Sequence, residues 1–451
     1  MRAIWRSPGR PVPRFAPRLR AQISIRGEYE RVERTQAAER SRIADPALAP
    51  EGEQRIEWVA RHSPVLNRLA RARLADGALS GKRIALVVHL EAKTAYLATL
   101  LAETGAEVVV AGSNPGSTQD AVAAALVRRG IEVHGVHDAE PEAFEADLMA
   151  VADTRPELII DDGAELTTRL VKQRSDLVPG LGGVTEQTTT GVHRLRALAA
   201  SGRLTFPAIA ANDALCKHLF DNRYGTGQST LTAILRLTNR SAAGKEFCIV
   251  GYGWVGKGLA RYAAGLGGRV TVVEVDPIPA LEAHMDGHRV ARLADALPDA
   301  DVVITATGGV EAVGREHWAL LRDDVLLANA GHHDREIDVE TLDAVADRVE
   351  DVRPGVRRYS LRGGVRCYLL ADGRLVNIAG ADGHPVEIMD LSFAVQALAV
   401  HHLASTKLEP GLHRLPAELD SEIALTKLEA LSIRLDELRP SQRAFFEQWQ
   451  A

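Results

Sequence analysis

The fold of this chain is decided by residues 247–276, FCIVGYGWVGKGLARYAAGLGGRVTVVEVD. An apolar run leads into Gly251-x-Gly253-x-x-Gly256, a helix-compatible segment follows, and a second apolar run ends at Glu274. In this order the first glycine makes a tight turn, the second lets a pyrophosphate approach the backbone, and the third packs a helix against a strand. The stretch therefore predicts a dinucleotide-binding unit of strand, helix and strand.

Glu274 indicates which dinucleotide binds. It lies 18 residues beyond Gly256, where a carboxylate can hold the ribose hydroxyls of the adenosine half. A carboxylate repels a 2′-phosphate, so the sequence predicts NAD rather than NADP. A glycine-rich turn of ordinary packing is the alternative, but such a turn needs neither the second strand nor the acid.

The composition is that of an ordinary globular enzyme. The chain has 451 residues, 46% apolar and 25% charged, which is enough for about two or three domains. The net charge of −6 gives no reason to expect nucleic acid as a partner. The three cysteines show no metal-binding spacing and favour a reduced, cytoplasmic compartment. No window approaches about 18 uninterrupted apolar residues, so we expect no membrane span.

Residues 1–42 differ from the rest of the chain. Their first 26 residues are rich in arginine and contain no acidic residue. They contain no apolar segment of the kind found in secretory signals. An organellar transit peptide is one alternative, but we expect a disordered basic tail.

Strands alternate with helices along most of the remaining sequence. We expect strands at 83–88, 107–111 and 158–160, and helices at 53–73, 94–104 and 119–129. The polar segment 185–190 reads as a loop that ends this first series. A second series runs from about 245 to 371 and includes strands at 302–305 and 325–328. The alternation predicts two doubly wound α/β domains with parallel sheets, the nucleotide unit lying in the second.

Two further helices are expected near the C-terminus. Residues 392–403 are strongly apolar, and residues 423–438 carry leucines close to heptad spacing. Packing on the chain's own core and contact with another subunit are both open for these helices.

Polar clusters follow several of the predicted strands. They are 89–94 (HLEAKT), 161–163 (DDG), 186–191 (EQTTTG), 212–222 with Lys217 and Asp221, 329–334 (NAGHHD) and 377–385 (NIAGADGHP). Ligands of open α/β sheets bind beyond the carboxyl ends of the strands, so these clusters are candidates for a substrate site. Each has a structural alternative: a turn or helix cap for 161–163, a core histidine for His89, and a solvated helix pair for Lys217 and Asp221. No spacing of histidine, cysteine and carboxylate demands a metal.

Together these segments resemble the S-adenosyl-L-homocysteine hydrolase family. The resemblance runs from about residue 43 to the C-terminal region and is carried by SNPGSTQD (113–120), DDGAELT (161–167), EQTTTGVHRL (186–195), GYGWVGKG (251–258), GHHDREID (331–338) and GRLVNIAGADGHP (373–385). It implies a substrate-binding domain over 43–225, completed by about 386–415, a Rossmann NAD domain over 226–385, and a helical segment over 416–451. It also implies a tightly held NAD that oxidises the 3′-hydroxyl of a nucleoside. Loss of the C4′ proton, elimination of a 5′ thiol, addition of water and reduction then follow.

The resemblance also implies roles for individual residues. Catalytic roles fall on His89, Asp162, Lys217, Asp221 and His332. Substrate contacts fall on Glu91, Lys93, Thr94, Gln187 and His384. Cofactor contacts fall on Thr188, Thr189, Thr190, Asn222, Gly251, Gly253, Trp254, Val255, Gly256, Lys257, Gly258, Glu274, Gly331 and Asn377. The expected partners are a small nucleoside substrate and further copies of the chain, as a dimer or tetramer, with neither nucleic acid nor membrane.

Several positions depart from the family pattern. Glu91 and Lys93 stand where the family usually has threonine and a short polar or acidic side chain that accepts from the adenine amino group. Lys93 can only donate, so it suits an oxo group better than an amino group. Gln187 replaces a ribose-binding glutamate, and Trp254 replaces a small or acidic residue. The chain ends AFFEQWQA, without the lysine and tyrosine of the family's C-terminal tail.

Three functions are consistent with these residues. The first is hydrolysis of S-adenosyl-L-homocysteine to adenosine and homocysteine. The second is the same oxidation and elimination cycle on another nucleoside, such as a 5′ dehydration. The third is an inactive regulatory relative that binds NAD and a partner protein, which the retained acid–base residues argue against. The changed base-contact positions favour the second over strict conservation of substrate, whereas the surviving ribose-contact residues favour the first.

Overall fold

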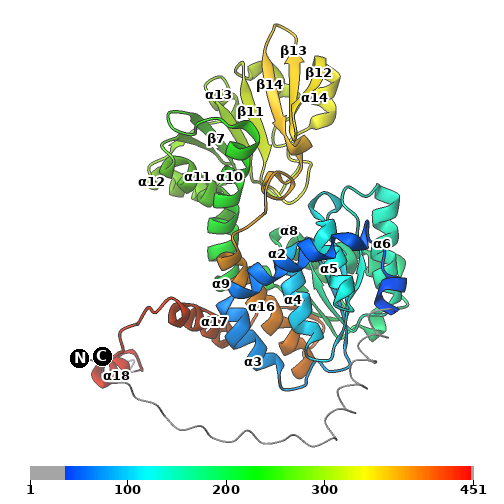
Figure 1. Ribbon diagram of the computed structural model, residues 1–451. Helices are drawn as coiled ribbons and strands as arrows, with labels where there is room; N and C mark the ends of the chain where they lie inside the picture. Colours follow the sequence, from blue (N-terminus) through cyan, green and yellow to red (C-terminus); the bar gives the residue numbers. More distant parts are fainter. Residues whose placement is uncertain (1–35, 448–451) are drawn as a thin grey trace, which may run out of the picture.

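The computed structural model describes residues 36–447, which form two α/β domains (Figure 1). The first domain and its connection to the second comprise η1 (Pro46–Leu48), α2 (Ala49–Arg61), η2 (Leu66–Ala70), α3 (Arg71–Leu74), β1 (Arg83–Val88), α4 (Ala92–Ala102), β2 (Glu107–Gly112), η3 (Pro115–Ser117), α5 (Asp120–Arg128), β3 (Glu132–His134), α6 (Pro141–Asp153), β4 (Leu158–Asp161), α7 (Glu165–Gln173), η4 (Val178–Gly180), β5 (Gly183–Glu186), α8 (Thr189–Ala200), β6 (Pro207–Ile209), η5 (Ala211–Asp213), α9 (Leu215–Lys217), η6 (His218–Gly225) and α10 (Thr226–Thr238).

The first domain is built on a seven-stranded parallel sheet. The strand order is β15-β6-β5-β4-β1-β2-β3, so the direction of winding reverses between β1 and β4. Strand β1 has the sequence RIALVV and is buried after its first residue, as expected for a parallel sheet covered on both faces. The crevice at such a reversal is where open α/β sheets bind ligands.

The second domain continues the chain after α10. It comprises β7 (Glu246–Val250), α11 (Trp254–Gly265), β8 (Arg269–Val273), α12 (Pro277–Met285), β9 (Arg289–Val290), α13 (Leu293–Ala296), β10 (Val302–Thr305), η7 (Arg315–Leu320), β11 (Val325–Asn329), α14 (Val339–Val345), β12 (Ala346–Arg353), β13 (Val356–Leu361), β14 (Arg366–Leu370), η8 (Ala371–Gly373) and α15 (Val376–Ala379). Its sheet has the order β12-β13-β14-β11-β10-β7-β8-β9 and reverses its winding between β7 and β10. Strands β12, β13 and β14 pair antiparallel, so one edge departs from the parallel sheet expected from the sequence.

The chain then returns to the first domain through α16 (Val386–Ser405) and β15 (Gly411–His413). Helix α16 is apolar on nearly all sides because it is packed within the core of the first domain, against β4, β5 and α4. Strand β15 extends the first sheet by pairing with β6. The first domain is therefore made of two separate parts of the sequence.

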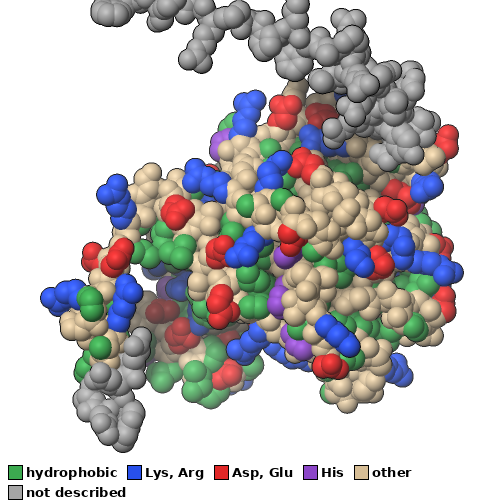
Figure 2. Space-filling model, turned by 90° about the horizontal axis from the view of Figure 1, so that it is seen from below, with side chains coloured by type: hydrophobic (Ala, Val, Ile, Leu, Met, Phe, Trp, Pro, Cys, Tyr) green, Lys and Arg blue, Asp and Glu red, His purple; other side chains and the backbone are tan. Residues whose placement is uncertain are grey.

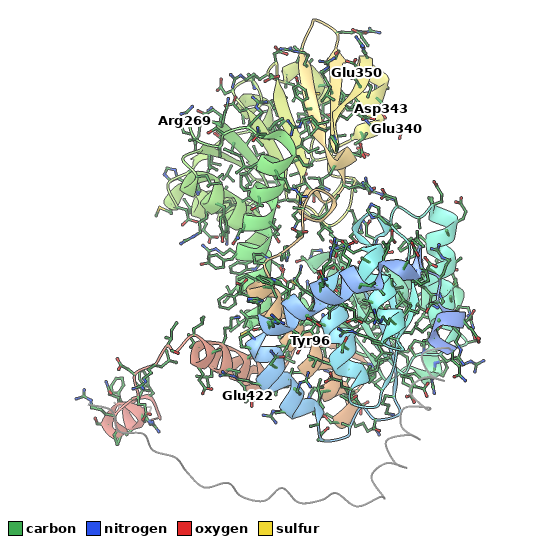
Figure 3. All side chains as sticks on the ribbon, in the orientation of Figure 1. Tyr96, Arg269, Glu340, Asp343, Glu350 and Glu422 are labelled. Atoms are coloured by element: carbon green, nitrogen blue, oxygen red, sulfur yellow. The ribbon has the colours of Figure 1, made fainter. Side chains whose placement is uncertain are left out.

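Helices α17 (Ala417–Ala430) and α18 (Pro440–Glu447) follow. Glu422 of α17 forms an ion pair of 2.6 Å with Arg73 of α3, and its place beside the first domain is labelled in Figure 3. Helix α18 lies apart from both domains in Figure 1. In Figure 2 the acidic and basic side chains of the visible face are interspersed. Within residues 36–447 no helix combines the length and apolar character that crossing a membrane requires.

Three further sequence expectations differ from this fold. Residues 36–42 were assigned to the tail, but residues 36–40 are helical and Arg42 pairs with the buried Asp147. Residues 185–190 are not a loop that ends the series, because β5 ends at Glu186 and α8 begins at Thr189. The helix expected over 423–438 ends at Ala430, since Ser432 has a φ of +59° that no α-helix accommodates.

Candidate active site

A cavity of about 310 Å³ lies between the two domains. The ends of β1, β4 and β5 reach it from the first domain, and the loops after β7, β10 and β11 reach it from the second. The predicted residues that line it are His89, Glu91, Lys93, Thr94, Asp162, Gln187, Thr188, Thr189, Thr190, Lys217, Asp221, Asn222, Gly253, Trp254, Val255, Gly331, His332, Asn377 and His384. The fold thus brings together all the residues predicted to contact substrate and most of those predicted to contact the cofactor.

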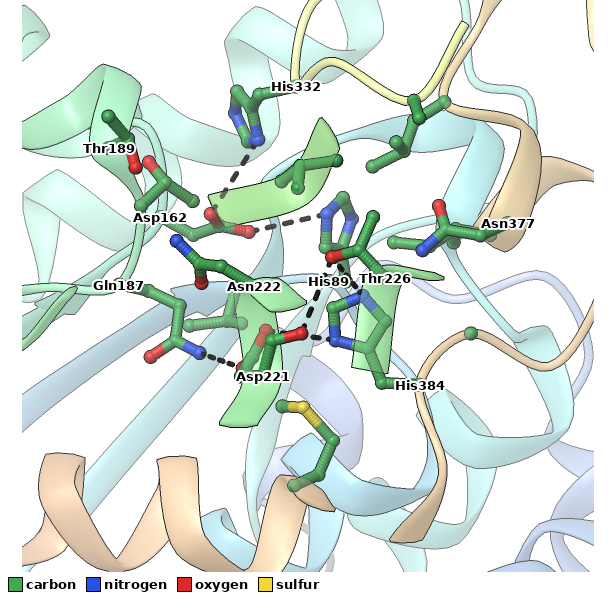
Figure 4. A pocket seen from close by; sticks show the side chains of 18 of the residues that line it. His89, Asp162, Gln187, Thr189, Asp221, Asn222, Thr226, His332, Asn377 and His384 are labelled. Carbon is green, nitrogen blue, oxygen red and sulfur yellow. Dashed lines mark hydrogen bonds and ion pairs between the residues drawn. The ribbon is translucent and has the colours of Figure 1, made fainter. Parts of the chain in front are cut away.

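Asp162 stands between two histidines (Figure 4). Its Oδ2 lies 3.5 Å from Nε2 of His89, and its Oδ1 lies 3.9 Å from Nδ1 of His332. Oδ2 accepts a hydrogen bond of 2.9 Å from Ser113, whereas Oδ1 is buried and has no partner within residues 36–447. A buried carboxylate oxygen without a partner is costly, so Oδ1 is available to a bound substrate.

Ser117 determines which ring nitrogen of His89 carries the proton. Oγ of Ser117 donates to the carbonyl of Asn114 at 2.7 Å, so it must accept from Nδ1 of His89 at 2.7 Å. The Nε2 lone pair of His89 therefore faces Asp162, ready to take a proton from it. Burial lowers the pKa of His89, although the charge of Asp162 opposes this shift.

The same three side chains lie close enough together to bind a metal ion. The ligand atoms of His89, Asp162 and His332 lie within 4.8 Å of one another. The sequence shows no metal-binding spacing because these residues are far apart along the chain. Their donor set also suits proton transfer, and the alignment of His89 with Asp162 matches that use.

Lys217 and Asp221 form a buried ion pair, not the solvated helix pair that was the alternative. Their Nζ and Oδ1 atoms are 3.3 Å apart, and Nζ also donates to Oδ1 of Asn222 at 2.6 Å. Both side chains are at most 5% exposed. Burial raises the pKa of Asp221, but the charge of Lys217 and contacts with His384 outweigh it, and the net shift is downward.

Asp221 is the centre of a wider network. It accepts from Ser392 at 2.6 Å and from Gln187 at 3.5 Å, and its Oδ1 lies 3.1 Å from Nδ1 of His384. The other ring nitrogen of His384 lies 3.1 Å from the hydroxyl of Thr226. His384 arrives from the segment that links the second domain back to the first. The network thus joins the first domain to both segments that connect it with the second, through Thr226 of α10 and His384.

Glu91 and Lys93 form a second charged pair on the cavity wall. Nζ of Lys93 lies 2.8 Å from Oε2 of Glu91 and donates to the carbonyl of Asp382 at 3.1 Å. Glu91 also caps α4 by accepting from the backbone N–H of Lys93 at 3.0 Å. An ammonium has three donors, and the two contacts described leave one for a ligand. The pair therefore offers both a donor and an acceptor.

The glycine loop fits a dinucleotide. Gly251 has a φ of +98°, and a Cβ there would lie 2.6 Å from the carbonyl oxygen of Ala306. A Cβ at Gly256 would lie 2.0 Å from the carbonyl oxygen of Gly251, so both positions require glycine. Helix α11 begins at Trp254 without a side-chain cap, which leaves its first N–H groups free for a pyrophosphate.

Glu274 and Asn377 are also placed where they could contact a dinucleotide. The Glu274 carboxylate accepts from the backbone N–H of Tyr252 at 2.7 Å and of Val275 at 2.7 Å, which fixes its direction beside the glycine loop. Asn377 is fully buried, and its Oδ1 has no partner within the described part of the chain. It lines the cavity, where the amide of a nicotinamide or a ribose hydroxyl can donate to it. The residues present therefore fit NAD.

Trp254 joins the glycine loop to the first domain. Its ring centroid lies 4.9 Å from that of His218, which follows Lys217, and Nζ of Lys257 lies over its ring, 4.8 Å from the centroid. Gly251, Gly256, Lys257, Gly258 and Glu274 do not line the cavity. Gly251 and Gly256 shape the loop, Gly258 packs closely against Arg223, and Glu274 accepts from the backbone N–H of Tyr252.

The structure gives roles to residues to which the sequence assigned none. Ser113 and Ser117 orient Asp162 and His89, and Thr307 and Gly308 line the cavity. Glu186 and Glu336 hold the loops around it. Ser113 and Ser117 lie in the quoted segment 113–120, so a polar segment directly after a predicted strand was the available signal for them. Glu186 and Glu336 also lie in quoted segments, 186–191 and 331–338, but their role depends on backbone groups at 163–164 and 307–308, which are distant in the sequence.

The dinucleotide loop and the acid–base residues share one cavity, which defines an NAD-dependent α/β enzyme. Profiles described as "S-adenosyl-L-homocysteine hydrolase" and "S-adenosyl-L-homocysteine hydrolase, NAD binding domain" match residues 40–179 and 222–383. The chain belongs to the S-adenosyl-L-homocysteine hydrolase family.

Curated relatives cover nearly the whole chain. It is 47% identical to an adenosylhomocysteinase of Thermococcus kodakarensis over 90% of this chain and 97% of that protein. It is 49% identical to an adenosylhomocysteinase of Thermotoga maritima, over 88% and 99%. It is also 47% identical to an S-inosyl-L-homocysteine hydrolase of Methanopyrus kandleri, over 90% and 97%. Both adenosyl and inosyl names therefore occur among relatives of equal similarity.

Proposed function

We propose that this enzyme hydrolyses S-adenosyl-L-homocysteine to adenosine and homocysteine. One observation carries the proposal: the His89–Asp162 pair and the Lys217–Asp221 pair line the same cavity as the dinucleotide loop. A C–S bond at a saturated carbon resists direct attack by water, and a temporary ketone at C3′ makes elimination across C4′ and C5′ accessible. Bound NAD⁺ would supply the hydride acceptor for C3′ and return the hydride at the end of the cycle.

Lys217 serves the 3′-oxygen in this proposal. Its ammonium stabilises the negative charge that develops when the hydroxyl proton leaves. Asp221 and His384 lie next to it, 3.1 Å apart, and can carry that proton away. Gln187 and Asn222, which contact Asp221 and Lys217, hold the sugar and the lysine in place.

Asp162 and His89 serve C4′ and the 5′ group. The Asp162 carboxylate, whose Oδ2 faces His89, removes the proton from C4′, the C5′–S bond breaks, and the electrons of that bond leave with the sulfur. The proton passes from Asp162 to Nε2 of His89 and from there to the thiolate, so that neutral homocysteine departs. In the second half His89 takes a proton from the water that adds to C5′, and Asp162 returns a proton to C4′. The free lone pair of His89 supports this relay.

A second candidate, the inosyl thioether, is favoured by the Glu91–Lys93 pair. Glu91 can accept from the amino group of adenine, whereas Lys93 can donate to the oxo group of hypoxanthine. The neighbouring carboxylate therefore relieves the conflict between Lys93 and adenine expected from the sequence alone. The same cavity supports both substrates.

We also propose a cytoplasmic homo-oligomer. Three buried cysteines without disulfides, Cys216, Cys248 and Cys367, support a reduced compartment. An exposed apolar strip on and beside α12, made of Val275, Ile278, Leu281 and Met285, supports a contact between copies. Light scattering on the purified protein tests the assembly, and a strictly monomeric mass contradicts it.

The substrate is tested by incubating the NAD-loaded enzyme with S-adenosyl-L-homocysteine, its inosyl analogue and plain nucleosides. Thiol release and absorbance at the NADH wavelength are followed together. Thiol from the adenosyl compound supports the proposal. Thiol from the inosyl compound alone makes the second candidate the function. Absorbance change with another nucleoside and no thiol from either compound contradicts both.

A further inference from the structure

Glu186 grips the turn that carries Asp162. Its Oε1 accepts from the backbone N–H of Gly163 at 2.9 Å, and its Oε2 accepts from the backbone N–H of Ala164 at 2.8 Å. The same carboxylate accepts from the backbone N–H and the hydroxyl of Thr188, at 2.8 and 2.9 Å. Glu186 is fully buried and does not itself line the cavity.

The gripped backbone has an unusual conformation. Gly163 has a φ of +79°, and Ala164, which has a side chain, has φ 54° and ψ 36°. Left-handed residues other than glycine persist only where surrounding contacts hold them. The two oxygens of Glu186 bind the two consecutive N–H groups of this turn, so the carboxylate supplies that hold.

Gly191 leaves the space that the Glu186 carboxylate occupies. A Cβ at Gly191 would lie 2.1 Å from Cδ of Glu186, so only glycine leaves room for it. Asp161, the neighbour of Asp162, instead caps α7 through the backbone N–H of Thr167 at 2.8 Å. Of the three carboxylates here, Asp161 and Glu186 are occupied with backbone groups, and only Asp162 faces the cavity.

The second domain contains the same arrangement, a buried glutamate that accepts from two consecutive backbone N–H groups. Glu336 is fully buried and accepts from the backbone N–H groups of Thr307 and Gly308, both at 2.8 Å. A Cβ at Gly331 would lie 1.7 Å from Oε1 of Glu336. In each domain a buried glutamate thus lies against a glycine and holds the turn after the neighbouring strand. The repetition argues for a requirement at the cavity, because the two turns lie in different domains.

We infer that Glu186 is a positioning residue that aims the Asp162 carboxylate at C4′ of the substrate. This inference rests on the proposed function. The inference predicts different effects on two steps of the reaction. Removal of the C4′ proton depends on the turn 162–164, whereas hydride loss from C3′ depends on Lys217, which lies on α9. Loss of the hydrogen bonds from Gly163 and Ala164 to Glu186 should slow removal of the C4′ proton much more than hydride loss from C3′.

The test uses Glu186→Gln in the NAD-loaded enzyme. A glutamine oxygen can accept one of the two N–H groups, but its amide N–H then faces the other, so the grip is broken with little change in volume. Exchange of the C4′ hydrogen of adenosine or inosine in D₂O, followed by NMR, should fall at least tenfold. Formation of NADH on mixing with the same nucleoside should fall by less than threefold.

Asp390→Asn is the matched control. Asp390 also binds two consecutive backbone N–H groups, of Val65 and Leu66, but lies outside the cavity lining. It should lower thermal stability and leave the ratio of C4′ exchange to NADH formation unchanged. Adding Ala164→Gly to Glu186→Gln should restore part of the exchange, since glycine adopts the turn without help. Absence of this rescue contradicts a role through the backbone.

Hydrogen–deuterium exchange of the backbone at 161–168 separates this inference from the proposed function. Glu186→Gln should lose protection there even if no nucleoside turns over. Equal protection in wild type and variant, or equal slowing of C4′ exchange and NADH formation, overturns the inference. A wild-type enzyme that forms no NADH with any nucleoside overturns the proposed function, and the backbone result still decides whether Glu186 holds the turn.

Discussion

Nζ of Lys217 lies 3.3 Å from Oδ1 of Asp221, and both side chains are buried at the edge of the cavity between the domains. Opposite charges this close stabilise each other in a low-dielectric site, and each would be costly without the other. The pair belongs to one short stretch of helix, so its geometry does not depend on how the domains meet. Lys217 is therefore held in place before substrate binds.

Replacing Lys217 by methionine should leave Asp221 buried without its partner. We expect a loss of about 3–5 kcal/mol in the free energy of unfolding and a fall of about 10²–10⁴-fold in NADH formation with nucleoside. Denaturant unfolding and stopped-flow absorbance measure these effects. The double variant with Asp221→Asn should recover much of the stability but not the rate. Oxidation at the wild-type rate in the single variant would show that Lys217 does not serve the 3′-oxygen.

His89→Asn should separate the two halves of the reaction in another way. In the proposed cycle His89 passes the proton to the leaving thiolate, so we expect homocysteine release to slow by about 100-fold or more. NADH formation should persist, because the proposal assigns the 3′-oxygen to Lys217. The ratio of thiol released to NADH formed in a single turnover is the measurement. Equal loss of both signals would contradict a role confined to the 5′ side.

Lys93→Gln should change the choice of base. Lys93 offers a charged donor to an oxo group, and a charge-assisted hydrogen bond contributes about 1.5–3 kcal/mol. The ratio of kcat/KM for the inosyl compound to kcat/KM for the adenosyl compound should therefore fall by about 10–100-fold. Glu91 remains to accept from adenine in this variant. An unchanged ratio would mean that Lys93 does not face the base.

Asp161 should make stability depend on pH. Burial raises its pKa to about 6, although the hydroxyl and N–H of Thr167 oppose the shift, while an unfolded aspartate titrates near 3.9. The native state thus binds the proton more tightly. This contribution to stability is fully present below about pH 4 and is lost as pH rises through about 6, by up to about 3 kcal/mol. Asp161→Asn should lack this change.

Denaturant unfolding between pH 4 and 7 measures the difference between wild type and Asp161→Asn. The wild type should lose stability relative to the variant across this window. A difference that is constant with pH would show that Asp161 is not protonated in the native protein in this range.

The features predicted from sequence were those fixed by local pattern. The glycine loop and the strand at 302–305 lie where expected, since apolar runs and glycine spacing are read within a few residues. The polar segment 185–190 was misjudged because Glu186 is buried by partners at 163 and 164, which no local pattern reveals. The helix expected to reach 438 stops where Ser432 adopts a left-handed conformation.

In the site, too, local sequence patterns identified some residues, whereas long-range contacts determine how they are oriented. His89 and Asp162 were found because each follows a strand, and parallel strands end at one edge. The orientation of His89 by Ser117 depends on a turn 28 residues away, and the proximity of His332 depends on the second domain. Chemistry that rests on such long-range contacts needs the folded chain.

The most direct test of the central claim is homocysteine release from S-adenosyl-L-homocysteine by the NAD-loaded enzyme, measured beside adenosine and net NADH. The proposed cycle predicts equal amounts of homocysteine and adenosine over many turnovers, with no net accumulation of NADH. Thiol that stops after one equivalent per bound NAD, or NADH that accumulates with product, would contradict a cofactor reduced and reoxidised within each turnover.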